Sequence, residues 1–504
     1  MKSFIILCFI LFKLAFLIAQ SKQVSGIVFV DENKDGIYNH GEQTLKGIAV
    51  SNQKDIVLTN DKGEYNILLR DAAFLYVMKP SGYQVALNDQ NFQQNYYFHH
   101  TQGAPNYLKY TGVYTTGNLP KQIDFPLYKI DEEKPLKALI IGDPQTADNE
   151  RLDFFRDGGV TDMLKQEADF YIVLGDVADD YLDIYPREKA IISQLDIPGY
   201  HVPGNHDINY KSKNAINHFE TFRKAYGPDY YAFNYNKTHF VILNNVNYFG
   251  WDTKNNKRGS YFGGLDRTQL EWLENDLRLV PDDYLIVLNS HIPFLDRFTD
   301  ATVLKELTQL LVHRKVLMLS GHTHAVQTYW NTRGLSEGVI AGASCGSWWT
   351  GPNNEEGIPV ATSMDGSPKG YFVFQFSGTD YDYKFIPENH PEDYQIRITL
   401  PLKTEPQCIT ANWFIGKPHE KVMLRFDNQE PMEMENYTGF DPFMERTMAF
   451  RKNKDNWTPG LSETQHLWKV QIPKELSKGV HKIEVTAYTD NGKIVKGYKI
   501  FEIQ

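Results

Sequence analysis

Two stretches decide the fold: Lys137-Ala-Leu-Ile-Ile-Gly142-Asp143 and Phe170-Tyr-Ile-Val-Leu174-Gly175-Asp176. Each is an apolar run of strand length that ends in Gly-Asp, and a stretch of helical character lies between them, up to residue 166. Strands that alternate with helices in this way predict βαβ units and parallel strand pairs. Open α/β sheets bind their ligands at the ends of such strands, where the Gly-Asp pairs stand.

The alternation continues on the C-terminal side. Further strand patterns fall at residues 199–202, 239–243, 284–288 and 316–319, and helical patterns fall at residues 268–279 and 303–313. A charged segment at residues 131–135 is typical of a linker. We therefore expect an α/β domain at residues 135–386.

Five short motifs follow predicted strands and carry metal-binding groups. They are Asp143-Pro-Gln145, Gly175-Asp176-Val-Ala-Asp179, Gly204-Asn205-His206-Asp207, Ser290-His291 and Gly321-His322-Thr-His324. A lone Gly-Asn-His-Asp is most often a turn, and a lone His-x-His is most often a surface or core pair. All five in order supply carboxylates, an amide and imidazoles, which bind divalent metals. The set predicts a two-metal site that hydrolyses phosphoesters.

The residue types match the needs of that reaction. Hydrolysis requires a deprotonated water molecule, neutralised charge on the phosphoryl oxygens and a proton for the leaving oxygen, and two metal ions about 3.5–4 Å apart supply the first two. His206 is the candidate proton donor, because an imidazole titrates in the required range. The candidate metal ligands are Asp143, Asp176, Asn205, His291, His322 and His324.

With these motifs, residues 135–386 resemble the calcineurin-like metallophosphoesterases, in which a sandwich of two β-sheets is flanked by helices. The resemblance implies two metal sites that share the bridging carboxylate of Asp176. The other ligands of one site would be Asp143, Gln145 and His324. Those of the other site would be Asn205, His291 and His322. It also implies that a bridging hydroxide attacks in line.

The resemblance further implies that His206 is the general acid and that Asp179 holds it in place. One departure concerns the first motif, which in the family is Asp-x-His and here is Asp143-Pro-Gln145. A glutamine ligates through its carbonyl oxygen, a harder donor than imidazole. We therefore expect two divalent ions as cofactors, with Mn²⁺ or Mg²⁺ favoured over Fe or Zn²⁺.

A second departure concerns the substrate. Serine/threonine phosphoprotein phosphatases place a phosphate-binding Arg directly after the residue that matches Asp179, whereas Asp180 and Tyr181 stand here. Without that Arg, bidentate capture of a dianionic monoester is not evident, and a diester is slightly favoured. Cationic side chains from loops remain candidates to enter the pocket, namely Arg187, Lys211 and Arg297.

A glycine-rich aromatic segment follows the last histidine motif and contains Trp348 and Trp349. It resembles a signature of bacterial three-domain members of the family. The two tryptophans are candidates to line the substrate cleft. The alternative is that they form a core between domains.

The flanking regions alternate short strands with Gly, Asn and Asp turns, which predicts β-sandwich domains at residues 20–130 and 395–504. The first resembles prealbumin-like modules. These domains either bind glycan or protein or brace the cleft, and their sequence does not decide between these roles. The predicted fold class is thus α/β, a two-sheet sandwich flanked by helices, with an all-β domain on each side.

Residues 31–42 match the spacing of a calcium-binding loop, with oxygen donors at Asp31, Asn33, Asp35 and Glu42 and a glycine at Gly36. A strand-like run precedes this loop, where a calcium-binding helix–loop–helix unit has a helix. A plain turn between strands is therefore the alternative to a structural Ca²⁺ site.

Residues 1–19 have the order of a signal peptide: a basic start, an apolar run and a small-residue end. We expect cleavage and export to the periplasm or the extracellular space; the alternative is an uncleaved anchor. No later segment has the length and apolarity of a transmembrane helix. Cys345 and Cys408 remain in the mature chain, and export permits a disulfide, but the sequence does not show whether they meet.

The net charge of −11 provides no basic field, so we expect no nucleic-acid polymer as a partner. Two function classes remain. One is a secreted metal-dependent phosphoester hydrolase, either a phosphodiesterase or a phosphatase. The other is a surface-binding protein that kept the scaffold and has weak catalysis. The presence of both His206 and Asp179 favours the enzyme. The natural substrate and the oligomeric state stay open.

Overall fold

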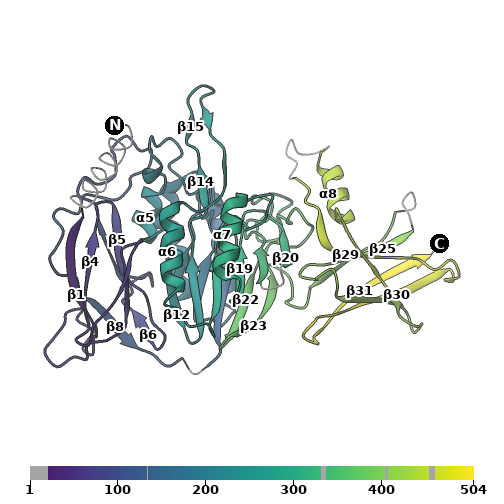
Figure 1. Ribbon diagram of the computed structural model, residues 1–504. Coiled ribbons are helices and arrows are strands. Elements are labelled where there is room, and N and C mark those ends of the chain that lie inside the picture. The colour runs from purple at the N-terminus through teal and green to yellow at the C-terminus, as the bar shows by residue number, and fades with distance from the viewer. Residues whose placement is uncertain (1–20, 133, 331–335, 403–406, 453–459, 504) are drawn as a thin grey trace, which may run out of the picture.

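The structure is a computed structural model that describes residues 21–132, 134–330, 336–402, 407–452 and 460–503. The predicted signal peptide at residues 1–19 lies outside the described residues. Two all-β domains lie on opposite sides of a central α/β domain (Figure 1). None of the helices in the described ranges is both long and apolar enough to cross a membrane.

The N-terminal domain is a sandwich of two four-stranded sheets, in the orders β4-β1-β8-β6 and β3-β2-β5-β7. Strand β4 shows why these residues pair, because its side chains alternate strictly between exposed and buried positions. The strands are β1 (Lys22–Val30), β2 (Ala49–Ser51), β3 (Ile56–Leu58), β4 (Glu64–Leu69), β5 (Ala73–Val77), β6 (Tyr83–Val85), β7 (Tyr96–His99) and β8 (Phe125–Lys129).

The central domain is a sandwich of a five-stranded and a six-stranded sheet, in the orders β11-β10-β9-β22-β23 and β12-β13-β18-β19-β21-β20. The strands of the first are β9 (Leu136–Ile141), β10 (Phe170–Val173), β11 (Gly199–His201), β22 (Gly370–Ser377) and β23 (Asp380–Pro387). Those of the second are β12 (Tyr231–Tyr235), β13 (Thr238–Ile242), β18 (Leu285–Asn289), β19 (Lys315–Ser320), β20 (Val326–Trp330) and β21 (Ser336–Ala341). The predicted fold class is confirmed.

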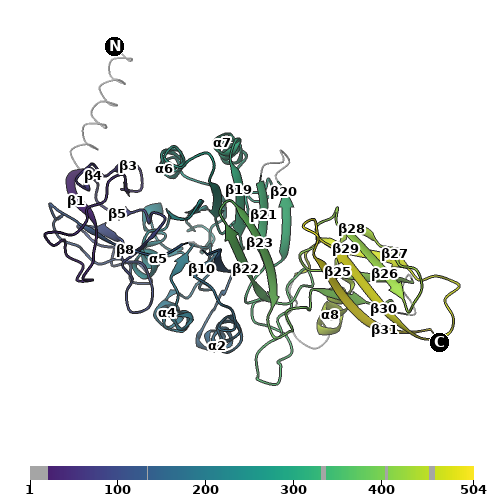
Figure 2. The same ribbon diagram turned by 90° about the horizontal axis from the view of Figure 1, so that it is seen from below.

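Helices cover the two outer faces of this sandwich (Figure 2). Those beside the five-stranded sheet include α2 (Asn149–Phe154) and α4 (Tyr185–Ile192), and those beside the six-stranded sheet are α6 (Arg267–Leu277) and α7 (Ala301–Leu311). Between α2 and the short α3 (Thr161–Met163), residues Phe155–Val160 form a π-helical turn. Helix α5 (Glu220–Tyr226) follows β11 in the chain.

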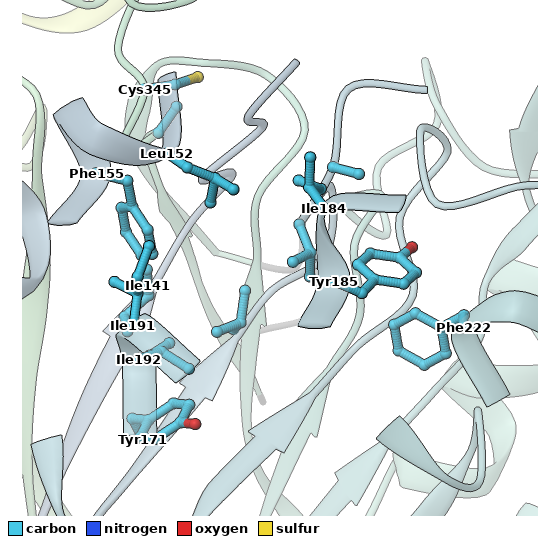
Figure 3. Packing of buried hydrophobic residues seen from close by; sticks show 14 of the residues in the cluster. Ile141, Leu152, Phe155, Tyr171, Ile184, Tyr185, Ile191, Ile192, Phe222 and Cys345 are labelled. Atoms are coloured by element: carbon cyan, nitrogen blue, oxygen red, sulfur yellow. The ribbon is translucent and has the colours of Figure 1, made fainter. Parts of the chain in front are cut away.

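Strand β10 explains the uninterrupted apolar run seen in the sequence. All four of its residues are buried, because Phe170 and Ile172 face the second sheet while Tyr171 and Val173 face the helices. In the helix-side cluster, Tyr171 and Ile141 lie with Leu152 and with the helix-α4 residues Ile191 and Ile192 (Figure 3). Burial on both faces holds the strand ends, and hence the motifs after them, in fixed positions.

The C-terminal domain also consists of two four-stranded sheets, in the orders β24-β25-β29-β28 and β27-β26-β30-β31, with one helix, α8 (Pro442–Lys452). Its strands are β24 (Ile396–Thr399), β25 (Cys408–Trp413), β26 (Lys421–Phe426), β27 (Met432–Glu433), β28 (Glu435–Gly439), β29 (Thr464–Gln471), β30 (Gly479–Tyr488) and β31 (Ile494–Ile503). Cys345 and Cys408 are both free thiols, so the two do not pair in this structure.

The predicted calcium loop is a turn whose side chains bind its own backbone. The Asp31 carboxylate accepts hydrogen bonds from the amides of Lys34 and Gly36, at 2.7 and 2.9 Å. Glu42 accepts from the amides of Glu32 and Asn39. Neither of the two clusters of potential metal ligands found among the described residues includes this loop. Calcium binding by Asp31, Asn33, Asp35 and Glu42 stays a prediction.

A buried ion pair joins the N-terminal domain to the central domain. Lys79 Nζ lies 3.0 Å from Glu132 Oε1, donates to the Asn234 carbonyl at 2.7 Å and lies 3.4 Å from the centre of the Tyr235 ring. The two charged side chains are only 1% and 7% exposed. Burial lowers the pKa of Lys79 to about 8, although Glu132 opposes that shift.

Lys79→Ala should destabilise the protein by about 3–5 kcal/mol, because it leaves the Glu132 carboxylate buried without its cation. Urea unfolding followed by tryptophan fluorescence would measure the loss. Lys46→Ala is the matched control, since Lys46 pairs with Asp61 where both side chains are at least 72% exposed, and its loss should stay below about 1 kcal/mol. Equal effects of the two substitutions would contradict a structural role for the buried pair.

Candidate metal centre

All five motifs lie at the carboxyl ends of strands, and the two sheets contribute them together. Asp143, Asp176 and Asn205 follow β9, β10 and β11 of the first sheet, whereas His291 and His322 follow β18 and β19 of the second. Strands β9, β10 and β11 are parallel to one another, as are β18 and β19. Their ends therefore bring these side chains to one edge of the sandwich.

Three predicted ligands converge on His291, which is fully buried. Its Nε2 atom lies 3.3 Å from Asp176 Oδ2, 2.9 Å from Asn205 Oδ1 and 3.2 Å from His322 Nδ1. Its Nδ1 atom lies 2.8 Å from the Leu174 carbonyl oxygen, which leaves Nε2 to face the other donors. Asp176, His291 and His322 form one of the two clusters of potential metal ligands in the described residues.

Asp143 and His324 form the other side of this centre. His324 Nδ1 lies 2.7 Å from the Gly346 carbonyl oxygen, so its Nε2 atom faces Asp143 Oδ1 at 3.8 Å. The Asp143 carboxylate also accepts the His322 amide. We use the name metal centre for six residues, which are Asp143, Asp176, Asn205, His291, His322 and His324.

Gln145 lies beside this centre and contacts two of its neighbours. Its Nε2 donates to Asp179 Oδ1 at 3.3 Å, and its Oε1 lies 3.9 Å from the Cys345 thiol. The same thiol lies 3.6 Å from His324 Nδ1. Gln145 therefore connects the Asp179 carboxylate with the side of the centre that holds His324.

The backbone of the centre is strained. Five of the seven predicted metal ligands have positive φ angles although none is a glycine; these are Asp143 (30°), Gln145 (38°), Asp176 (47°), His322 (74°) and His324 (51°). Each such residue costs about 1–3 kcal/mol and persists only where the surroundings hold it, as they do at functional sites. The concentration of this strain at the motifs supports a functional rather than a structural role.

The glycines of the motifs allow the close approach of these loops. At Gly175, φ is +89° and a Cβ atom would lie 2.6 Å from His291 Nδ1. At Gly204, a Cβ atom would lie 2.0 Å from the Asp176 amide nitrogen. Any side chain at either position would push a metal ligand out of place.

Buried charges of both signs are concentrated in the centre. Burial and the nearby Asp176 carboxylate raise the pKa of Asp143 to about 8. Burial opposes protonation of His291, yet the charge of Asp176 raises its pKa to about 9. Burial lowers the pKa of His322 to about 3 and that of His324 to about 4. Two neutral imidazoles beside two carboxylates suit a divalent cation, whose binding would displace the remaining protons.

His206 lies next to the centre with two carboxylates on one ring nitrogen. Its Nδ1 atom is 3.0 Å from Asp179 Oδ1 and 3.0 Å from Asp180 Oδ1. Burial opposes its charge, yet the carboxylates of Asp176, Asp179 and Asp180 raise the pKa of His206 well above its usual value. The sequence identified Asp179 as its partner, and the structure adds Asp180.

A cationic side chain contacts Asp180 beside His206, but it is none of the three that the sequence suggested. Arg187 binds Asp153, Lys211 lies over the Trp251 ring, and Arg297 binds Gln327.

The cation beside His206 is Arg258, whose Nη1 donates to Asp180 Oδ1 at 2.9 Å. No motif in the sequence marks Arg258, because it lies 78 residues after Asp180 in the chain.

The two adjacent tryptophans have different places. Trp348 is partly exposed, and its ring stacks on His324 at 4.4 Å between centroids. Trp349 is buried; its Nε1 donates to the Pro144 carbonyl at 2.8 Å, and its ring packs near Phe155. Trp348 thus borders the metal centre, whereas Trp349 packs in the helix-side core of the central domain. Lining of a substrate cleft by these tryptophans stays a prediction.

Two further aromatic rings lie beside His322 of the metal centre. The rings of Tyr261 and Phe298 lie 5.9 and 5.8 Å from the His322 ring. Neither residue belongs to a sequence motif, and their places follow from the packing of the loops around β17 (Tyr261–Gly263) and after β18.

Asp207 holds two of the motif loops together. Its Oδ1 accepts from the Ala178 amide and the Tyr185 hydroxyl at 3.1 and 2.8 Å, and its Oδ2 accepts from the amides of Val177 and Gly204 at 3.2 and 2.9 Å. The carboxylate is fully buried. It therefore fixes the loop of Asp176 against the loop of Asn205.

Comparison with known families matches three consecutive parts of the chain. Residues 31–113 match the family model for the N terminal of Calcineurin-like phosphoesterase, and residues 136–326 match that for Calcineurin-like phosphoesterase. Residues 339–494 match the C terminal of Calcineurin-like phosphoesterase. The three matched parts correspond to the order of β domain, α/β domain and β domain found in the structure.

Two curated relatives are similar to part of the chain. A probable glycerophosphodiester phosphodiesterase, GpdQ, of Arcobacter nitrofigilis is 29% identical over 178 residues, which are 33% of this chain and 61% of the relative. A 3′,5′-cyclic-nucleotide phosphodiesterase of Nostoc is 24% identical over 169 residues, which are 32% of this chain and 58% of the relative. The chain thus spans less than two thirds of the length of either relative.

Solved structures with some likeness include a purple acid phosphatase from yellow lupin seeds, with a TM-score of 0.36 and 12% identity over 67% of this chain and 66% of that one. Another is the phosphopantetheinyl hydrolase of Mycobacterium tuberculosis, with a TM-score of 0.29 and 13% identity over 42% of this chain and 91% of that one.

Asp207→Ala should weaken the binding of Mn²⁺ by about 10–100-fold, because loss of a residue that orients metal ligands has effects of that size. Calorimetric titration of the metal-free protein would measure the change. Asp183→Ala, which removes an exposed carboxylate from the segment after Asp180, should leave the affinity unchanged. Unaltered Mn²⁺ affinity in the Asp207 variant would contradict the bracing role.

Proposed function

Since the chain belongs to the calcineurin-like phosphoesterases, we propose that it is a metal-dependent phosphoester hydrolase. The observation that carries this proposal is the convergence of the six residues of the metal centre beside His206. A scaffold kept only for binding would not need buried carboxylates and imidazoles in strained backbone at one point.

The donors present fit two divalent ions. Asp176, Asn205, His291 and His322 would hold one ion, and Asp143 and His324 would hold the other together with Asp176. Gln145 would add its carbonyl oxygen to the second ion; in this structure that oxygen faces the Cys345 thiol. Ions bound there would lower the pKa of a water molecule and neutralise charge on the phosphoryl oxygens. The oxygen-rich set favours Mn²⁺ or Mg²⁺.

His206 is the proton donor of the proposed reaction. Because its Nδ1 atom faces Asp179 and Asp180, its Nε2 atom is left for the leaving oxygen of the substrate. The neighbouring carboxylates raise the pKa of His206 well above its usual value, which favours the protonated state that a general acid requires. Asp179 and Asp180 hold the ring in the orientation that donation needs.

We propose phosphodiesters as the preferred substrate class. The carboxylates of Asp179 and Asp180 lie beside His206, and Arg258 is already bound to Asp180. A dianionic monoester would meet more repulsion there than a diester with one negative charge. The two curated relatives named above are both called phosphodiesterases, which supports the same choice.

With Mn²⁺ present, the protein should hydrolyse bis(4-nitrophenyl) phosphate faster than 4-nitrophenyl phosphate, because the diester carries less negative charge. Release of 4-nitrophenol, measured side by side in Mn²⁺, Mg²⁺ and Zn²⁺, would show the preference. Asp176→Asn should abolish both activities, since it removes the carboxylate shared by the two sites. Faster turnover of the monoester would refute the diester assignment, and no turnover in any metal would refute hydrolysis of these esters.

Gln145→His should increase the zinc or iron that stays bound after aerobic purification, because imidazole is a softer ligand than an amide oxygen. Elemental analysis of the purified variant and of the unaltered protein would measure the difference. Gln145→Asn, which keeps an amide, is the control and should not gain metal. Tightly held zinc or iron in the unaltered protein would show that the amide does not set metal preference.

A further inference from the structure

Arg258 belongs to a hairpin that contributes none of the six residues of the metal centre. The hairpin consists of β14 (Val246–Tyr248), β15 (Trp251–Asp252), β16 (Lys257–Arg258) and β17 (Tyr261–Gly263), in which β14 pairs with β17 and β15 with β16. It projects from the central domain, with β15 near its tip (Figure 1). Arg258 lies on β16, where it pairs with Trp251 of β15.

The guanidinium of Arg258 joins the two loops that hold the proton donor. Nη1 donates to both carboxylate oxygens of Asp180, at 2.9 and 3.2 Å, and lies 3.4 Å from His206 Nδ1. Nη2 donates to the backbone carbonyl of Asn205, the residue before His206. One side chain thus binds the loop after β10 and the loop after β11.

Aromatic contacts fix the hairpin against the loop that follows His206. The Arg258 guanidinium lies 5.8 Å from the Tyr210 ring and 5.5 Å from the Tyr261 ring. Tyr210 stacks on Trp251 of the hairpin at 5.8 Å, and its carbonyl accepts the Tyr248 hydroxyl at 2.8 Å. These contacts leave the guanidinium little freedom to reach another partner.

The hydrogen-bond capacity of His206 shows why such a brace matters. Its Nδ1 atom carries at most one hydrogen, yet two carboxylates lie at the same 3.0 Å distance from it. Asp180 has a second partner in Arg258, whereas Asp179 is bound by the neutral amide of Gln145. His206 Nδ1 makes its hydrogen bond with Asp180 Oδ1 at 3.0 Å, so His206 and Arg258 share the Asp180 carboxylate, and Asp179 lies at ion-pair distance from the same nitrogen.

We propose that Arg258 is a positioning residue for His206: by binding the Asn205 carbonyl and the Asp180 carboxylate, it fixes the acceptor that Nδ1 contacts and leaves Nε2 for the substrate. This role rests on the proposed function of His206 as proton donor. Arg258 lies on the Nδ1 side of the imidazole, away from the Nε2 atom that would face the substrate. It therefore acts through His206 and not on the phosphoryl group.

The test compares two diesters that differ in their need for a proton. 4-Nitrophenolate leaves readily without protonation, whereas phenolate, from a group with a pKa near 10, depends on an acid. Arg258→Ala should lower kcat for diphenyl phosphate by about 100-fold, the low end of the range for loss of general acid catalysis, and for bis(4-nitrophenyl) phosphate by less than about fivefold. KM should change little for both, and Arg258→Lys should recover part of the lost rate.

Two further variants separate positioning from other roles. In a His206→Ala background, Arg258→Ala should cause no additional loss, because the two residues act through one step. Lys257→Ala is the matched control, since Lys257 precedes Arg258 on the same strand and is exposed; it should behave like the unaltered protein. A loss that is equal for both diesters and lies in KM would overturn the proposal and identify Arg258 as a phosphate-binding residue.

A measurement without turnover tests the orientation of the His206 ring separately from the proposed function. In the metal-free protein, the His206 Nδ1 proton should give a downfield proton NMR signal, assigned by its absence in His206→Ala. That signal should persist in Arg258→Lys and disappear in Arg258→Ala. If the unaltered protein cleaves neither diester, the proposed function fails, and the NMR signal alone then decides the positioning role; its persistence in Arg258→Ala would overturn that role.

Discussion

The crowding of buried carboxylates at one edge of the sandwich is the constraint on which the other features depend. Asp143 and Asp176 are both buried beside His291, and burial together with the charge of Asp176 raises the pKa of Asp143. Like charges in a dry site are tolerated only where cations compensate them. The left-handed backbone conformation of the ligands and the glycines next to them allow the motif loops to lie this close together. Strain and charge both indicate a site built for metal ions.

The C-terminal domain braces this site through a chain of hydrogen bonds. His466 Nε2 lies 3.1 Å from Asp365 Oδ2, which also accepts the Val326 amide at 2.8 Å. Val326 begins β20, two residues after His324, and the Met364 amide donates to the His324 carbonyl. The last histidine motif is thus held by a residue of a neighbouring domain. This contact supports bracing as one role of that domain, and binding of glycan or protein by it stays a prediction.

The elements that hold the proton donor, His206, differ from those that hold the metal ligands. Whereas the ligands depend on strand ends inside the sandwich, His206 depends on Asp179, Asp180 and a hairpin outside it. The site therefore combines a rigid half, fixed by buried strands, with a half fixed by surface hydrogen bonds. The second half is where substrate preference is expected to vary, because loops tolerate change better than packed strands.

The sequence by itself determined the strands that precede the motifs, the order of the motifs and the type of chemistry, because apolar runs that end in Gly-Asp or precede His are local patterns. Tertiary structure alone decided that Arg258 meets Asp180, that Trp348 borders His324 while Trp349 is core, and that Gln145 contacts Asp179. These contacts join residues from about 20 to more than 200 positions apart. Their geometry follows from how two sheets and their loops pack, which no local pattern records.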